Sequence, residues 1–137
     1  MPIREIKRKV DILRSYLEEM DRFLVVSDKD ILADDMKLRA IERVFQLIVD
    51  EAVDINTLIL ADAVSQSPES YKSTFFMLAD EKIIDRDLSE KISGSAKIRN
   101  QIVHDYEKIS ESDLIQKIKK FQPIYKEYLA VLIKKYF

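Results

Sequence analysis

The chain has 137 residues, among them one glycine, three prolines, one histidine and no cysteine. This length fits a single domain, residues 1–137, with a hydrophobic core of its own. Average proteins contain about 7% glycine and about 5% proline, so the scarcity of both predicts an all-α fold. The composition excludes disulfides, thiolate metal sites, glycine-rich phosphate loops and metal sites that need two histidines from one chain, and no cofactor is expected.

Charge is nearly balanced, with 23 basic and 25 acidic residues and a formal net charge of -2. The whole chain therefore has no bulk attraction to nucleic acid or to anionic membranes. Lysines are nevertheless concentrated after residue 116, where they could form a phosphate-binding rim or, as is more common, a solvated helix surface. No apolar stretch is long enough to span a membrane and no signal peptide is evident, so we expect a cytoplasmic protein.

Two long helices are predicted in the first half of the chain. Apolar residues follow a spacing of three and four over residues 3–24, which places one apolar stripe along a helix. Residues 27–30 interrupt this pattern, and the same spacing resumes over residues 38–59. Both stripes need partners, so we expect these helices to pack against each other and against others.

The second half predicts a short helix and two longer ones. Ser67 and Pro68 are typical of a helix start and predict a short helix with Phe75 facing inward. Asp85 can cap a fourth helix that extends to about residue 106, and Ser110 can cap a fifth.

Pro123 should kink or split the fifth helix, because proline removes a helical hydrogen bond. The expected architecture is an up-and-down bundle of four main helices plus a short helix.

Residues 98–106 contain the most informative pattern, because Arg99 lies five positions before His104 and Tyr106 lies two after it. This arrangement resembles the R-x-x-x-x-H-x-Y motif of the HEPN superfamily. It is most similar to the HepT toxins, whose pattern also has asparagine after the arginine, as Asn100 does here. The resemblance covers roughly residues 35–110, including Leu38-Arg39-Ala40-Ile41-Glu42-Arg43 and Ser70-Tyr71-Lys72.

The resemblance implies a function for the chain. HepT-like proteins are metal-independent ribonuclease toxins, so RNA, with tRNA as one substrate, is the expected target. The family also implies a protein partner, a minimal nucleotidyltransferase antitoxin that transfers AMP to the tyrosine of the motif, here Tyr106. The fold that it implies is the HEPN-like helical bundle.

The chemistry of the residues agrees with RNA cleavage. Arg99 carries a permanent charge in a fork suited to phosphorane oxygens, and histidine is the side chain that exchanges protons near neutral pH. Cleavage needs a base, an acid and a cation, and one chain supplies a single histidine. Five residues of an ideal helix place Arg99 and His104 about 140° apart, which favours a composite site in a two-fold homodimer.

Each of these residues also has a structural interpretation. A lone histidine on a helix is usually a hydrogen-bonded residue without a catalytic role. Arg99 could form an ion pair with Asp105 or Glu107. Asn100 could orient the imidazole, contact a phosphate, or be a buried polar group at the dimer interface. Tyr106 could be a packing residue.

An alternative function remains open from the sequence. The chain could be a non-catalytic helical subunit of a nucleotidyltransferase complex, either binding a nucleotide or phosphate or acting as an adaptor without a ligand. Incubation of the purified protein with total RNA in the presence of a chelator separates these functions, because only the nuclease would cleave the RNA.

Overall fold

The computed structural model describes residues 2–104 and 109–137, which form seven helices and no strand. This confirms the all-α prediction. The helices are α1 (Ile3–Leu24), α2 (Asp28–Ala33), α3 (Asp35–Ala63), α4 (Tyr71–Asp80), α5 (Arg86–Ser93), α6 (Ser95–Val103) and α7 (Glu111–Tyr136). None of these helices is long and apolar enough to cross a membrane.

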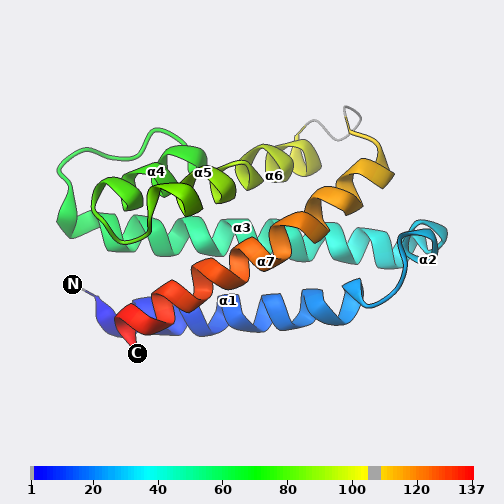
Figure 1. Cartoon of the computed structure of the whole chain (residues 1–137), viewed down its shortest axis with the longest axis horizontal. Coiled ribbons are helices and arrows are strands. Elements are labelled where there is room, and N and C mark those ends of the chain that lie inside the picture. Colours follow the sequence, from blue (N-terminus) through cyan, green and yellow to red (C-terminus); the bar gives the residue numbers. More distant parts are fainter. Residues whose placement is uncertain (1, 105–108) are drawn as a thin grey trace.

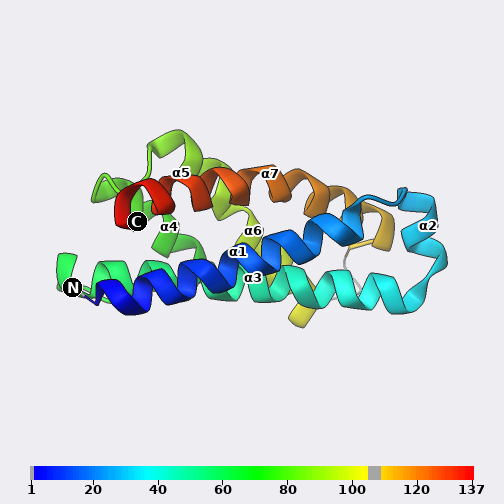
Figure 2. The same cartoon turned by 90° about the horizontal axis from the view of Figure 1, so that it is seen from below.

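The helices form the expected up-and-down bundle (Figure 1). The chain runs along α1, returns along α3, runs forward again through α5 and α6, and returns along α7, so that both termini lie at one end. Helix α1 packs against both α3 and α7, and in the view from below it runs between them (Figure 2). Helix α6, which carries Arg99 and Asn100, packs against α3, α4 and α7.

The core follows the apolar stripes that the sequence predicts. In α1 the buried side chains are Ile6, Val10, Leu13, Leu17 and Met20, although Ile3 at the helix start is exposed. In α7 the buried side chains include Leu114, Ile118, Phe121, Tyr125, Tyr128 and Leu132. Helix α1 packs against both α3 and α7, and burial of these apolar stripes is the main favourable contribution to folding, since apolar burial contributes about 25 cal/mol per Å².

Short polar side chains cap the helices, because the first backbone N–H groups of a helix have no partner within it. Asp85 accepts a hydrogen bond from the N–H of Leu88, and Ser110 accepts one from that of Asp113, as predicted. The predicted cap at Ser67 is wrong, because α4 begins three residues later at a capping box. There the side chain of Ser70 accepts from the N–H of Ser73 at 3.1 Å, and the backbone of Ser70 donates in return to the hydroxyl of Ser73 at 3.0 Å.

Two further boundaries differ from the sequence prediction. Residues 27–30 do not simply interrupt the helices, because residues 28–33 form α2, whose six residues are too few to show periodicity. The predicted fourth helix is divided at Gly94 into α5 and α6, and its described part ends at Val103. Gly94 lies against the ring of Phe121, with 3.4 Å between that ring and the position of an added Cβ.

Pro123 does not split α7, which runs without interruption from Glu111 to Tyr136. Pro123 is exposed, whereas its neighbours Gln122 and Ile124 are buried. The carbonyl group that loses its helical partner therefore belongs to the outer side of the helix, where water can satisfy it. The core side of α7 keeps its packing.

Buried polar contacts hold the helices around the motif in place. The amide of Asn56 on α3 donates to the hydroxyl of Thr74 on α4 at 3.0 Å and accepts from that of Tyr128 on α7 at 2.5 Å. The hydroxyls of Ser95 on α6 and Tyr125 on α7 share a hydrogen bond of 2.7 Å. Since unpaired buried polar groups are costly, these bonds define the relative positions of α3, α4, α6 and α7.

Candidate active site

The motif occupies the second half of α6 and the turn that follows it. Arg99 and Asn100 lie within α6, and His104 is the residue that ends it. The backbone N–H of His104 donates to the carbonyl oxygen of Asn100 at 2.8 Å, so His104 lies one helical turn beyond Asn100. Tyr106 falls outside the described residues, and its predicted role stays a prediction.

Arg99 is held in one orientation by three contacts. Its Nε donates to Oδ1 of Asp50 on α3 at 2.9 Å, and its Nη1 donates to the side-chain oxygen of Asn100 at 3.2 Å. The guanidinium also lies over the ring of Tyr71, at 4.9 Å from the ring centre, in a cation–π contact. Only 15% of the Arg99 side chain is exposed, so its position is determined by α3 and α4 as much as by α6.

Asp50 and Tyr71 form one electrostatic unit with Arg99. Burial raises the pKa of Tyr71 above its ordinary value, and the nearby carboxylate of Asp50 raises it further, while the charge of Arg99 acts in the opposite direction. The phenol therefore stays protonated at neutral pH. The unit thus places one fixed cation against a neutral aromatic ring.

His104 lies in a groove between the start of α4 and α6, with a volume of about 880 Å³. The groove is lined by Tyr71 and Lys72 from α4 and by Lys97 and Asn100 from α6, together with smaller side chains. His104 is exposed. Its imidazole is therefore within reach of a ligand in the groove, as a proton-transfer group has to be.

The structure separates Arg99 from His104 in the way that their helical angle predicts. Arg99 faces α3 and Tyr71, whereas Asn100 and His104 share the groove. The alternative ion-pair partners Asp105 and Glu107 lie outside the described residues, and the described partner of Arg99 is Asp50. Asn100 is exposed and lines the same groove as His104.

Sequence reasoning did not identify Asp50 or Tyr71 as members of this site. Asp50 is 49 residues from Arg99, and nothing in the sequence distinguishes it from its acidic neighbours Glu51 and Asp54. Tyr71 lies in the stretch Ser70-Tyr71-Lys72 that carries part of the resemblance, and the structure shows it partly buried beneath Arg99. A metal site is not formed by the described residues, since no three acidic or histidine side chains gather among them.

Comparison with known proteins identifies the family of this chain. The family model described as Ribonuclease HepT-like matches residues 13–132, which include the complete motif. The chain belongs to the HepT-like family. This confirms the resemblance that the motif indicates and extends it to the outer helices α1 and α7, which the motif region does not include.

One curated protein is similar to this chain in sequence, and solved structures are similar to it in fold. The HepT-like chain is 28% identical over 113 residues to a tRNA nuclease HepT from Aphanizomenon flos-aquae, covering 82% of this chain and 77% of that one. Its fold is similar to that of a tri-AMPylated HEPN toxin of Shewanella oneidensis in complex with an MNT antitoxin, with a TM-score of 0.85, 17% identity and 98% of each chain covered. The cytosolic protein YutE from Bacillus subtilis has the same fold, with a TM-score of 0.83 and 16% identity over 98% of this chain and 90% of that one.

Proposed function

We propose that this HepT-like chain is a ribonuclease toxin that cleaves RNA, with tRNA as its substrate class. The observation that carries the proposal is the family match over residues 13–132, a range that includes Arg99 and His104 of the motif. The relative from Aphanizomenon flos-aquae is a tRNA nuclease, which supports the choice of substrate. Such a substrate implies a cytoplasmic protein. We also infer a single domain, because helices from both ends of the chain share one core.

The proposed reaction is a transesterification that uses no metal. A base removes the proton of the ribose 2'-hydroxyl, whose oxygen attacks the neighbouring phosphorus. The bond to the 5'-oxygen then breaks, and an acid donates a proton to that oxygen, leaving a 2',3'-cyclic phosphate. His104 supplies the proton transfer, and the guanidinium of Arg99 stabilises the negative charge of the phosphorane.

The active form is proposed to be a homodimer. One protomer presents a single imidazole, and its Arg99 is held by Asp50 and Tyr71 and does not line the groove that holds this imidazole. A two-fold axis would bring two imidazoles and two guanidinium groups together, which supplies both a base and an acid. In this arrangement Asn100, which accepts a hydrogen bond from Arg99 beside His104, is a supporting residue.

The first test of this function uses purified protein and total RNA in a buffer that contains a chelator. The wild-type chain should produce fragments that end in a 2',3'-cyclic phosphate. His104→Ala should abolish cleavage while circular dichroism and the dimer remain unchanged, because His104 is exposed and contributes little to the core. Arg99→Lys should also lose activity, since an ammonium group cannot replace the planar fork.

Failure of the wild-type chain to cleave RNA would favour a non-catalytic nucleotide-binding or adaptor subunit instead. Mixing Arg99→Ala and His104→Ala chains tests the composite site, because a mixed dimer would contain one complete pair of groups. Activity of a demonstrably monomeric sample would contradict the dimer.

The proposed regulation is AMP transfer to Tyr106 by a minimal nucleotidyltransferase antitoxin. The fold relative from Shewanella oneidensis is tri-AMPylated and bound to an MNT antitoxin, which supports such a partner. The phenolic oxygen would attack the α-phosphorus of ATP, losing its proton and releasing pyrophosphate. The attached phosphodiester adds negative charge two residues after His104 in the sequence and would repel RNA.

Co-expression with the antitoxin tests this step. The toxin should gain the mass of one or more AMP units on the peptide that contains Tyr106, and cleavage should be lost. Tyr106→Phe should keep nuclease activity and resist neutralisation. An unmodified Tyr106 in a silenced toxin would mean that the antitoxin acts by binding alone.

A further inference from the structure

The groove beside His104 is positively charged, whereas the chain as a whole carries a slight negative charge. The protein is acidic overall, yet two lysines, Lys72 on α4 and Lys97 on α6, line this groove. Its described lining contains no carboxylate. Anionic ligands are therefore attracted to this part of the surface, because a hollow lined by one sign of charge concentrates the opposite sign.

The two lysines are also available to a ligand. Both side chains are exposed, and neither forms an ion pair within the part of the chain that the structure describes. Other lysines differ in this respect: Lys126 pairs with Asp21 at 2.8 Å, and Lys119 pairs with Asp28. A phosphate that binds at Lys72 and Lys97 does not have to displace a carboxylate first.

Tyr71 connects the groove to the other motif residue. Its ring lines the groove, and the guanidinium of Arg99 lies over that ring at 4.9 Å from its centre. A ligand in the groove therefore contacts His104 directly and lies one side chain away from Arg99. The volume of about 880 Å³ is within the range of about 300–1,000 Å³ that is usual for small-molecule sites, so a nucleotide fits.

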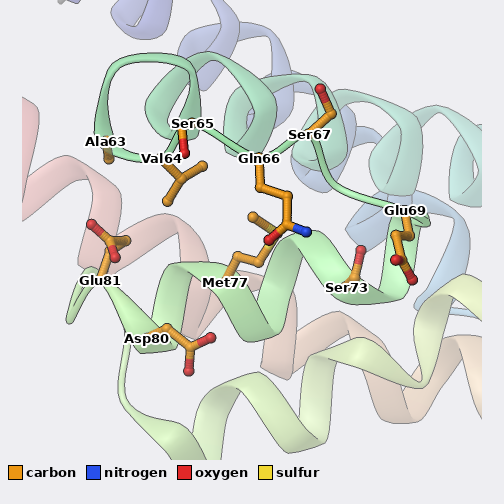
Figure 3. Close-up of a pocket in the computed structure, with 10 residues that line it drawn as sticks. All are labelled: Ala63, Val64, Ser65, Gln66, Ser67, Glu69, Ser73, Met77, Asp80 and Glu81. Carbon is orange, nitrogen blue, oxygen red and sulfur yellow. The ribbon is translucent and has the colours of Figure 1, made fainter.

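A second hollow of similar kind does not suit a phosphate. It has a volume of about 510 Å³ and lies between α4 and the segment that follows α3 (Figure 3). Glu69, Asp80 and Glu81 line it, and its described lining contains no basic residue. These carboxylates repel a phosphate backbone, so charge distinguishes the two hollows.

We propose that the groove lined by Lys72, Lys97, Asn100 and His104 binds a single-stranded segment of the RNA substrate, with Lys72 and Lys97 on phosphates next to the cleaved bond. This rests on the proposed ribonuclease function and adds the residues that hold the strand. Single strands are bound by basic grooves that follow the backbone, often beside an aromatic side chain, and this groove provides both features. Lys72 and Lys97 act in binding and do not take part in proton transfer.

The adjoining hollow between α6 and α7 provides a matched control. Lys97 lines both hollows, whereas Lys117 and Lys120 line only this one, together with Glu90 and Asp113. Replacing these two lysines removes the same charge at a short distance from the proposed strand. The pair Lys72→Gln/Lys97→Gln is therefore compared with the pair Lys117→Gln/Lys120→Gln.

The experiment measures binding of a fluorescent single-stranded RNA with 2'-O-methyl groups to the full chain, at several salt concentrations. This probe cannot be cleaved, because its attacking hydroxyl is blocked. Each phosphate of a single strand contributes about 0.7 to the slope of log K against log salt, so Lys72→Gln/Lys97→Gln should reduce the slope by about 1.4 and weaken binding about 25-fold at 0.1 M salt. The control pair should keep the wild-type slope. On cleavable RNA the groove variant should raise KM and leave kcat near the wild-type value.

The outcomes test the proposed RNA-binding role of the groove separately from the proposed nuclease function. Equal losses in both pairs would show diffuse attraction and would overturn the groove, as would an unchanged slope in Lys72→Gln/Lys97→Gln or no binding by the wild-type chain. A selective loss of binding in a chain that cleaves no RNA would support the groove and reject the nuclease. Cleavage without a selective loss would support the nuclease and reject the groove.

Discussion

Replacing Asp50 by asparagine tests whether the contact with α3 positions Arg99. Asparagine keeps the shape and a side-chain oxygen, but it removes the charge that faces Nε of Arg99 at 2.9 Å. At this distance two unit charges attract by about 6 kcal/mol with an effective dielectric constant of about 20, and desolvation offsets most of this energy. A hydrogen bond to a charged group contributes about 1.5–3 kcal/mol net, so we expect the free energy of unfolding to fall by about 2 kcal/mol.

Asp54→Asn is the matched control for this variant. Asp54 lies one turn further along α3, is 61% exposed and pairs with Lys9 at 3.6 Å. Exposed pairs of this kind contribute about 0–1 kcal/mol, so urea unfolding should separate the two variants clearly. A Tyr71→Phe reference identifies the Tyr71 signal in an alkaline absorbance titration. There Asp50→Asn should lower the pKa of Tyr71, because the Asp50 carboxylate helps to raise it.

Cleavage of RNA completes this test. A guanidinium without its fixed partner samples several orientations, and every 1.36 kcal/mol lost from the transition state reduces the rate tenfold. We therefore expect kcat to fall about tenfold in Asp50→Asn, with KM nearly unchanged. If Asp50→Asn were as stable and as active as Asp54→Asn, the proposed positioning of Arg99 by α3 would be wrong.

Three further predictions concern stability. Asn56→Ala should lower the free energy of unfolding by about 2–3 kcal/mol in urea titrations, because the hydroxyls that Asn56 bonds on α4 and α7 lose a buried partner. Gly94→Ala should stabilise the protein by up to about 1 kcal/mol and raise its melting temperature, because φ of Gly94 is -63° and the new methyl group lies 3.4 Å from Phe121. A lower melting temperature would reveal a clash. Burial alone would raise the pKa of Asp21, but hydrogen bonds from Lys126 and from the side-chain amide of Gln122 hold this pKa below its usual value of 3.8. The contribution of Asp21 to the free energy of unfolding is complete above the pKa of the unfolded chain and is lost as the pH falls through the lower pKa of the folded protein. The free energy of unfolding should therefore depend more steeply on pH between about 5 and 2 in the wild-type protein than in Asp21→Asn.

The two long helices in the first half of the chain show how much of the fold is local. Apolar spacing predicts α1 and α3 because a helix must place its apolar residues on one face to bury them. Apolar spacing does not predict α2, which is too short to show a period. The capping residues also mispredict the start of α4, because Ser67-Pro68 resembles a helix start, whereas the serines of the capping box form the start three residues later.

The candidate site divides in a similar way. His104 and Arg99 can be identified from the sequence, because the single histidine stands at a fixed spacing from an arginine. Lys97 and Lys72 have no such signal. They belong to different helices, and only the packing of α4 against α6 places both in one groove.

By itself the sequence determined the helical class, most of the apolar faces and the residues of the motif, because these depend on composition and on spacing within one helix. Only the tertiary structure decided what surrounds the motif. Asp50 approaches Arg99 across 49 residues, and Tyr71 covers the same guanidinium from a third helix. Such contacts depend on how helices cross and on how far each is rotated about its axis. These quantities result from the packing of the whole core, and no local pattern of residues encodes them.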